Sequence, residues 1–308
     1  MCLVYSPHSK QTSSRVFVFV FLFLFYNLFE LFRSGILTSW EDDDTCNIYV
    51  RPPRAATYLL TIMGQAEDQE ETTLQRLCVY AVRCVQTETN QFRFPEVTGS
   101  WGLQNPMATE CGLKQVKGTT FTFTAKDGAV TVPIGLLRHT ELAVRLRHAE
   151  APDEDLARYT LVEYGEEMVD IRARLPRAGN FLLRVFASHP QLRGMQHAAD
   201  FLLLLRADAP CQKDCLPFPR SSDFAHVNRT RLLQPLVREV SRGTASLFRV
   251  QAPRLARLCV DGRKMERGSD GVWEAEVTPE HDGKTVLISG SAQRGATHLS
   301  GLYTFDVV

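Results

Sequence analysis

Hydrophobic and polar residues alternate with a period of two over short stretches of the chain. Thr119–Thr124 reads TTFTFT, and Asp170–Leu175 reads DIRARL. Such alternation is typical of a strand with one face on a core and the other facing solvent. Similar short apolar segments predict strands at Thr57–Met63, Ala129–Ile134, Glu141–Leu146, Ala157–Glu163, Met168–Leu175, Phe181–Phe186, Phe201–Leu205, Ser246–Val250, Ala256–Val260, Val272–Val277, Thr285–Ser289 and Leu302–Val307.

Turn sequences rich in glycine separate these segments, among them Lys126–Gly128, Ala178–Asn180, Ser269–Gly271 and Asp282–Gly283. Many short strands at intervals of roughly 8–12 residues indicate β-sandwiches. No long amphipathic helix is predicted, although a turn or two of helix fits around Glu67–Arg76. The segment His189–Ala199 is predicted to form a variable loop between two apolar strands.

One block of sequence recurs. Residues 53–62 (PRAATYLLTI) return as residues 176–185 (PRAGNFLLRV), 123 positions later, and a weaker copy follows Pro279. Phe94-Pro95 likewise returns as Phe218-Pro219. The repeat predicts an all-β chain of tandem immunoglobulin-like β-sandwiches with a partial N-terminal repeat. We expect a hydrophobic leader at 1–43, a repeat remnant at 44–93, a complete sandwich at 94–217 and a terminal sandwich at 218–308.

The leader differs from the rest of the chain, because seven of the 18 phenylalanines lie between Phe17 and Phe32. Val16–Tyr26 has no polar residue, but the apolar stretch is shorter than a membrane-spanning helix and contains Glu30. Three interpretations stay open: a secretory signal or anchor, a buried strand, and translation of a thymine-rich tract such as one before a splice acceptor. We favour the last, because every abundant residue here has thymine-containing codons. Residues 44–93 alone lack the upstream strands of a sandwich and would be poorly stable.

Composition narrows the function classes. The chain has 35 basic and 35 acidic residues, so nothing in its net charge points to nucleic acid. Eight cysteines in 308 residues are too few for a disulfide scaffold, and reduced thiols are expected. Cys211 and Cys215 have no second pair of ligands at metal-binding spacing, so no metal is expected. Phosphate-binding glycine motifs are absent, and no cofactor is expected.

Candidate reactive groups are weak. Cys111 with His139 is the best nucleophile–base pair inside the complete repeat, but two unrelated sandwich residues are the favoured interpretation. Asp153–Asp155 resembles part of a calcium site, but calcium takes roughly six to eight oxygen ligands, and three adjacent acids are more often a solvated loop, which is favoured here. Asn228–Thr230 fits a glycosylation sequence, which matters only in a secreted chain. We therefore predict no catalytic residue.

The junction Phe94–Gly102 (FPEVTGSWG) and the turn Leu175–Phe181 (LPRAGNF) resemble those of the kyphoscoliosis peptidase and hillarin family. The resemblance spans about residues 48–308 and implies immunoglobulin-like repeats that follow a transglutaminase-like domain. That family's peptidase activity implies a Cys-His-Asp triad in the upstream domain, and no residue here matches it. The junction at Phe218–Phe224 departs from the pattern, because it lacks the Trp-Gly pair. The Cys-Trp-Cys spacing of true immunoglobulin domains is absent as well.

Phe94, Pro95 and Trp101 form the most distinctive group. They are expected to plug the junction between two sandwiches, with an aromatic anchor for a partner protein as the alternative. The predicted function is a non-catalytic protein-interaction or spacer module, cytoplasmic, with a protein partner of the cytoskeleton and neither nucleic acid nor membrane. Two alternatives stay open: a fragment of a longer transglutaminase-like peptidase, and a secreted or membrane-anchored adhesion protein in which Val16–Phe32 targets the chain.

Overall fold

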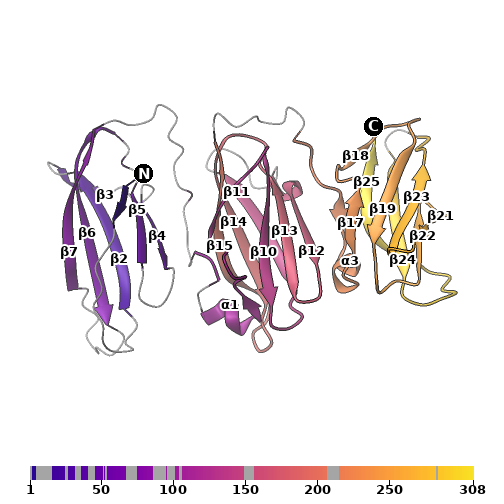
Figure 1. Cartoon of the computed structure of the whole chain (residues 1–308), viewed down its shortest axis with the longest axis horizontal. Coiled ribbons are helices and arrows are strands. Elements are labelled where there is room, and N and C mark those ends of the chain that lie inside the picture. The colour runs from indigo at the N-terminus through magenta and orange to yellow at the C-terminus, as the bar shows by residue number, and fades with distance from the viewer. Residues whose placement is uncertain are drawn as a thin grey trace.

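The structure is a computed structural model that describes residues 2–4, 16–24, 27–31, 36–40, 46–50, 52, 54–66, 75–85, 95, 101–103, 106–148, 156–206, 215–281 and 284–308. The described residues form three β-sandwiches that lie side by side in a row (Figure 1). Their strands run across the long axis of the molecule (Figure 1). The prediction of an all-β chain of tandem sandwiches is confirmed.

The first sandwich has two sheets, of order β1-β5-β4 and β3-β2-β6-β7. Buried residues of β5 and β6, with half-buried residues of β4 and β7, form its small core. The bounds are β1 (Cys2–Val4), β2 (Val16–Leu24), β3 (Asn27–Leu31), β4 (Ile36–Trp40), β5 (Cys46–Val50), β6 (Ala56–Ala66) and β7 (Gln75–Cys84).

Strand β2 lies within the hydrophobic leader and pairs antiparallel with β6 over nine residues, from Val16 opposite Ala66 to Leu24 opposite Tyr58. This pairing places β2 in the same sheet as the repeated strand β6. The boundary expected at residue 43 falls between β4 and β5, which pair with each other. The upstream strands of this repeat therefore come from the segment before residue 44. Of the short helix considered around Glu67–Arg76, Gln75 and Arg76 belong to β7, and the remainder lies outside the described residues.

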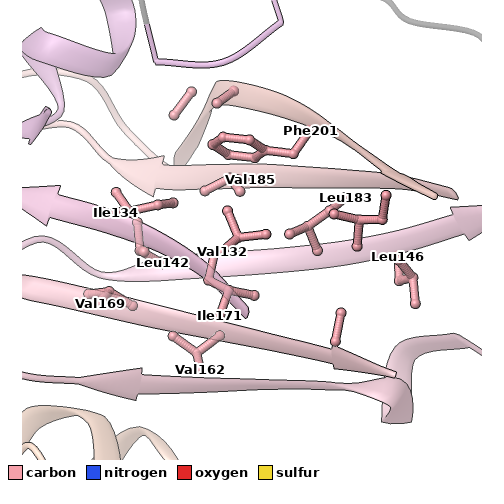
Figure 2. Close-up of a cluster of buried hydrophobic side chains, with 14 of the residues drawn as sticks. Val132, Ile134, Leu142, Leu146, Val162, Val169, Ile171, Leu183, Val185 and Phe201 are labelled. Atoms are coloured by element: carbon pink, nitrogen blue, oxygen red, sulfur yellow. The ribbon is translucent and has the colours of Figure 1, made fainter. Parts of the chain in front are cut away.

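The second sandwich packs the sheets β12-β13-β10-β8 and β11-β14-β15-β9 face to face. Its core contains inward-facing aliphatic residues of both sheets (Figure 2) together with aromatic residues that include Phe181 and Phe201. The bounds are α1 (Pro106–Glu110), β8 (Leu113–Lys114), β9 (Thr122–Thr124), β10 (Ala129–Leu136), β11 (Leu142–His148), a 3₁₀ turn at Ala157–Tyr159, β12 (Thr160–Tyr164), β13 (Met168–Arg174), β14 (Gly179–Ser188) and β15 (Met195–Leu205).

The loop predicted at His189–Ala199 is shorter than expected, because β15 already begins at Met195. A bulge after Val185 shifts the register, and His197 pairs with Phe186 across the hairpin. The ring of His197 also lies edge-on to that of Phe186, with centroids 5.8 Å apart. His197 and Phe186, both half-buried, therefore share one face of the hairpin.

The third sandwich packs β17-β19-β23-β22 against a sheet of order β16-β25-β24-β20-β21, with β18 also paired to β25. The bounds are β16 (Arg220–Ser221), α3 (Asp223–Val227), β17 (Arg231–Gln234), β18 (Glu239–Val240), β19 (Ser246–Gln251), β20 (Arg257–Val260), β21 (Arg263–Lys264), β22 (Glu266–Arg267), β23 (Val272–Val277), β24 (Thr285–Ser291) and β25 (Ser300–Val307).

The sequence repeat corresponds to a repeated hairpin. Strands β6 and β7 pair antiparallel in the first sandwich, and β14 and β15 pair in the same way in the second. Tyr58, Leu60 and Ile62 are buried, as are their counterparts 123 positions later, Phe181, Leu183 and Val185. Alternate residues of these strands thus face a core in both copies.

Candidate interaction sites at the sandwich junctions

Trp101 begins the second sandwich at its junction with the first. Its backbone forms an isolated parallel bridge with Asp200 on β15, and the Gly102 N–H donates to the Asp200 carbonyl at 2.8 Å. The half-buried indole lies 5.5 Å from the ring of Phe121, which lies 6.1 Å from the ring of Tyr49 on β5. These three rings connect the core of the second sandwich to a strand of the first. Of the other predicted junction residues, Pro95 is half-buried and Phe94 lies outside the described residues.

The strand to which Trp101 attaches is held by a buried acid. Asp200 is fully buried and accepts two hydrogen bonds from the Arg184 guanidinium, 2.9 Å from Nε and 3.3 Å from Nη2. His197 Nε2 lies 3.0 Å from the same carboxylate. The His197 ring also packs edge-on against Phe186 of β14. The side chains of Arg184, His197 and Asp200 thus join β14 and β15 where Trp101 attaches.

A second junction joins the second sandwich to the third. Leu161 on β12 faces outward from its own sheet, is 1% exposed, and belongs to the buried core cluster of the third sandwich. The Phe218 N–H donates to the Arg158 carbonyl at 2.9 Å, and Phe218 also belongs to that core. The two sandwiches therefore share apolar core and backbone hydrogen bonds.

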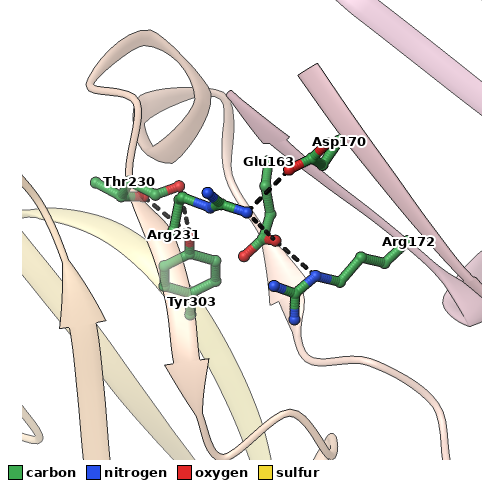
Figure 3. Close-up of polar contacts among 6 residues, drawn as sticks. All are labelled: Glu163, Asp170, Arg172, Thr230, Arg231 and Tyr303. Atoms are coloured by element: carbon green, nitrogen blue, oxygen red, sulfur yellow. Dashed lines mark hydrogen bonds and ion pairs between the residues drawn. The ribbon is translucent and has the colours of Figure 1, made fainter. Parts of the chain in front are cut away.

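Charged groups of both sandwiches meet at this junction (Figure 3). Glu163 on β12 has a fully buried side chain, with its Oε2 2.8 Å from Arg172 Nε and 3.9 Å from Arg231 Nη2. Arg231, on β17 of the third sandwich, also lies 2.9 Å from Asp170 Oδ2. Burial raises the pKa of Glu163, while the two arginines act in the opposite direction. An ion-pair cluster of this kind fixes how the two sandwiches are oriented, because each acid meets its base only in one arrangement.

Arg174 lies at the edge of the same junction. Its guanidinium carbon is 4.1 Å from the Phe218 ring centroid, and its Nη1 donates to the carbonyls of Leu216 at 2.6 Å and Leu236 at 3.0 Å. Burial lowers the pKa of Arg174. Asp170, Arg172 and Arg174 alternate along β13, so they share the outward face that the pattern DIRARL predicts. That face meets a neighbouring sandwich instead of open solvent, which alternation alone does not distinguish.

An aromatic contact also crosses this junction. Tyr164 accepts a hydrogen bond from the Leu142 N–H at 2.8 Å, its ring lies 5.4 Å from His226 of α3, and burial raises its pKa to about 12. Burial lowers the pKa of His226, so its neutral form packs against the tyrosine. Tyr303 donates to the Thr230 carbonyl at 3.1 Å from the core of the third sandwich.

The structure gives no support to the catalytic pair considered from the sequence. Cys111 is fully buried, with its sulfur 3.9 Å from the Ala187 carbonyl oxygen, and burial raises the pKa of its thiol. A raised pKa disfavours the thiolate that a nucleophile needs. The ring of His139 packs beside Tyr164 with centroids 6.0 Å apart. Asp153–Asp155 lies outside the described residues, and no cluster of three metal-ligating side chains occurs within the described ranges.

The glycosylation sequence lies at the end of α3. Asn228 is 8% exposed, and its Nδ2 donates to the Phe224 carbonyl at 2.9 Å. A glycan on that nitrogen would require this side chain to leave its buried position. In the part of the chain that the structure describes, no helix is long and apolar enough to cross a membrane.

The chain is distantly similar to several solved structures. A titin fragment of three immunoglobulin domains is 8% identical, with 94% of this chain and 88% of that chain covered and a TM-score of 0.20. A chimeric titin Z1Z2 is 11% identical, with coverage of 61% and 92% and a TM-score of 0.21. Extracellular domains 3–5 of Drosophila OTK are 10% identical, with coverage of 96% and 86% and a TM-score of 0.19. Among curated protein sequences, none matches the chain.

A family profile described as "KY-like, immunoglobulin-like domain" matches residues 29–95 and 101–219. The first range begins inside the predicted leader and includes strands β4 to β7, and the second covers the second sandwich. The two ranges together make up more than half of the chain, and they meet on either side of the junction that contains Trp101. This chain therefore belongs to the family of KY-like immunoglobulin-like domain proteins.

Proposed function

We propose that the chain is a non-catalytic protein-interaction or spacer module of a cytoskeleton-associated, transglutaminase-like peptidase family. The observation that carries this proposal is the burial of Leu161, a residue of the second sandwich, in the core of the third. Sandwiches that share core residues hold a fixed spacing, and a fixed array presents its surfaces to a partner at defined positions. The buried thiol of Cys111 supports the non-catalytic part of the proposal.

The proposed role is tested by expressing the tagged full chain in muscle cells. We expect it in the cytosol, retained in the detergent-insoluble cytoskeletal fraction, and cross-linked there to a protein partner. A peptidase assay on unfolded protein substrates should give the rate of buffer alone. Secretion of the chain, or hydrolysis that the Cys111→Ala variant loses, would overturn the proposal.

A second candidate is a fragment of a longer transglutaminase-like peptidase, which the family membership favours. In that case transcripts should continue upstream of Thr45 into a domain that encodes a Cys-His-Asp triad. Transcripts that read contiguously through residues 1–40, with no such domain before them, would exclude this candidate.

A further inference from the structure

A cleft of about 340 Å³ opens beside the second junction. Its floor is the outward face of β10 and β13, and its wall comes from the third sandwich. Charged residues of both sandwiches line it together with apolar side chains: Asp170, Arg172, Arg174, Arg231, Val130, Phe218 and Leu236. Its volume is at the small end of the range for ligand pockets and suits one or two side chains of a peptide.

Among the residues that the structure describes, the basic side chains around this cleft outnumber the acidic ones. Asp170 and Glu163 are the acids of the cluster, and their ion pairs go to Arg172 and Arg231. Arg174 is the third base, and among the described residues its guanidinium donates only to two backbone carbonyls. A half-buried cation without a counter-charge is costly, and an incoming anion would remove that cost.

Hydrogen-bond donors are also left over. Arg172 uses Nε for Glu163 (Figure 3), and its two terminal nitrogens have no acceptor among the described residues. A guanidinium binds a carboxylate best through two parallel N–H groups. Arg172 and Arg174 stand two positions apart on β13, so both point to the same side of the sheet and into the same cleft.

We propose that this cleft binds an acidic peptide segment of a protein partner, with a carboxylate on Arg172 and Arg174 and an apolar side chain against Phe218 and Leu236. The positive charge of Arg174 attracts the carboxylate. The apolar side chains of Phe218 and Leu236 bury an apolar side chain of the peptide, which a free inorganic anion lacks. This inference rests on the proposed role as an interaction module and names the chemistry of the partner.

The test is calorimetric titration of the full chain with two synthetic probes. One is a short capped peptide of alternating aspartate and leucine, and the other is its twin with asparagine in place of each aspartate. We expect the acidic peptide to bind and its uncharged twin to bind at least about tenfold more weakly, because charge-assisted hydrogen bonds are the stronger ones. Arg174→Gln and Arg172→Gln should each weaken binding of the acidic peptide by about tenfold as well.

Arg145→Gln is the matched control. Arg145 is an exposed arginine of the other sheet of the second sandwich, whose guanidinium lies over Phe186 at 5.3 Å, and its loss should leave the affinity unchanged. Added sodium phosphate should compete no better than sodium chloride of equal ionic strength. If an Arg variant does not fold, the wild-type chain still decides the matter, because its affinity for the acidic peptide should fall with salt and that of the twin should not.

Absence of wild-type binding to the acidic peptide, equal binding of both peptides, or an equal loss in Arg145→Gln would overturn the cleft proposal. If phosphate displaces the acidic peptide better than sodium chloride does, the cleft is a site for a free anion, and the peptide proposal is overturned. None of these results affects the cytoskeletal retention that tests the proposed function. Conversely, a chain that binds the peptide but is secreted would overturn the proposed function alone.

Discussion

Arg231 Nη2 of the third sandwich lies 2.9 Å from Asp170 Oδ2 of the second, so an ion pair joins two domains through residues 61 positions apart. The pair is partly buried, with side-chain exposures of 35% and 18%, and a partly solvated ion pair contributes little stability by itself. Its effect depends on the residues around it, because the buried Glu163 and the buried Leu161 lie on the adjacent strand β12. The contact therefore sets orientation, and the apolar burial beside it supplies most of the stabilisation.

Leu161→Ala should destabilise the third sandwich although the residue belongs to the second. Truncating a fully buried leucine costs about 2–5 kcal/mol, through lost apolar burial and the cavity left behind. Hydrogen exchange of amides in β24 and β25 should become faster. Leu137→Ala is the control, because Leu137 is 57% exposed and its truncation should have little effect. Unchanged exchange in β24 and β25 would show that the two sandwiches are energetically independent.

Gly179→Ala should destabilise the hairpin β14–β15 more than Gly194→Ala does. Both glycines have positive φ, 148° and 77°, so alanine would strain the backbone at either position. A Cβ at Gly179 would also lie 2.5 Å from His148 Nε2, whereas one at Gly194 would meet nothing within 4 Å. Urea unfolding of the two variants isolates this clash. Equal midpoints would mean that His148 moves aside at no cost.

The periodic strands and the repeat could be predicted from the sequence because each is a local pattern. Buried Tyr58 and Phe181 occupy equivalent hairpin positions, and the alternation along β13 correctly separates its two faces. What alternation does not contain is the neighbour on the outward face. Leu161 and Glu163 therefore gave no sign that they lie at a domain junction.

The surroundings of Trp101 could be predicted from the sequence only in part. Its place after a repeated Phe-Pro pair suggested a junction, but the site prediction itself remains to be tested by mutation. Its ring partner Phe121 and, beyond it, Tyr49 come from segments far apart in sequence, which no local pattern brings together. Their aromatic character was the only clue available.

Asn228 should carry no glycan even if the chain is forced through the secretory route. Its side-chain amide donates to the Phe224 carbonyl, and the residue is nearly inaccessible to solvent. In the folded domain a glycosyltransferase therefore cannot reach the Asn228 nitrogen. The mass of the chain secreted from mammalian cells behind a heterologous signal should not change on glycosidase treatment. Asn228→Gln, which cannot be glycosylated, is the reference for mobility. A glycosidase-sensitive wild-type band would support the secreted alternative and indicate modification before folding.

Trp101→Ala should lower the melting temperature of the full chain. The variant loses the contact with Phe121 and part of the burial at the first junction, on the order of 2 kcal/mol. Trp101→Phe is the matched control and should recover much of that loss by keeping a ring in place. Scanning calorimetry gives both values. Unchanged melting of Trp101→Ala together with loss of the cross-linked partner would make the residue a partner anchor instead of a plug.

Glu163→Gln should change how stability depends on pH. Burial raises the pKa of Glu163 in the folded chain above its unfolded value, so the folded state binds more protons between the two values. The free energy of unfolding then falls as the pH rises through that window, because the buried carboxyl must ionise there. The variant lacks this titration, so its stability relative to wild type should improve from the acidic to the alkaline side of the window. Urea unfolding across the acidic to neutral range measures the difference.

Glu274→Gln provides the reference for that experiment. Glu274 also forms an ion pair, with its Oε1 2.6 Å from Arg249 Nε, but its side chain is 44% exposed on the surface of the third sandwich. Its loss should leave the slope with pH close to that of wild type. If Glu163→Gln keeps the wild-type slope as well, the ion pairs with Arg172 and Arg231 fully offset the burial of the carboxylate. The junction would then be held by charge as much as by Leu161.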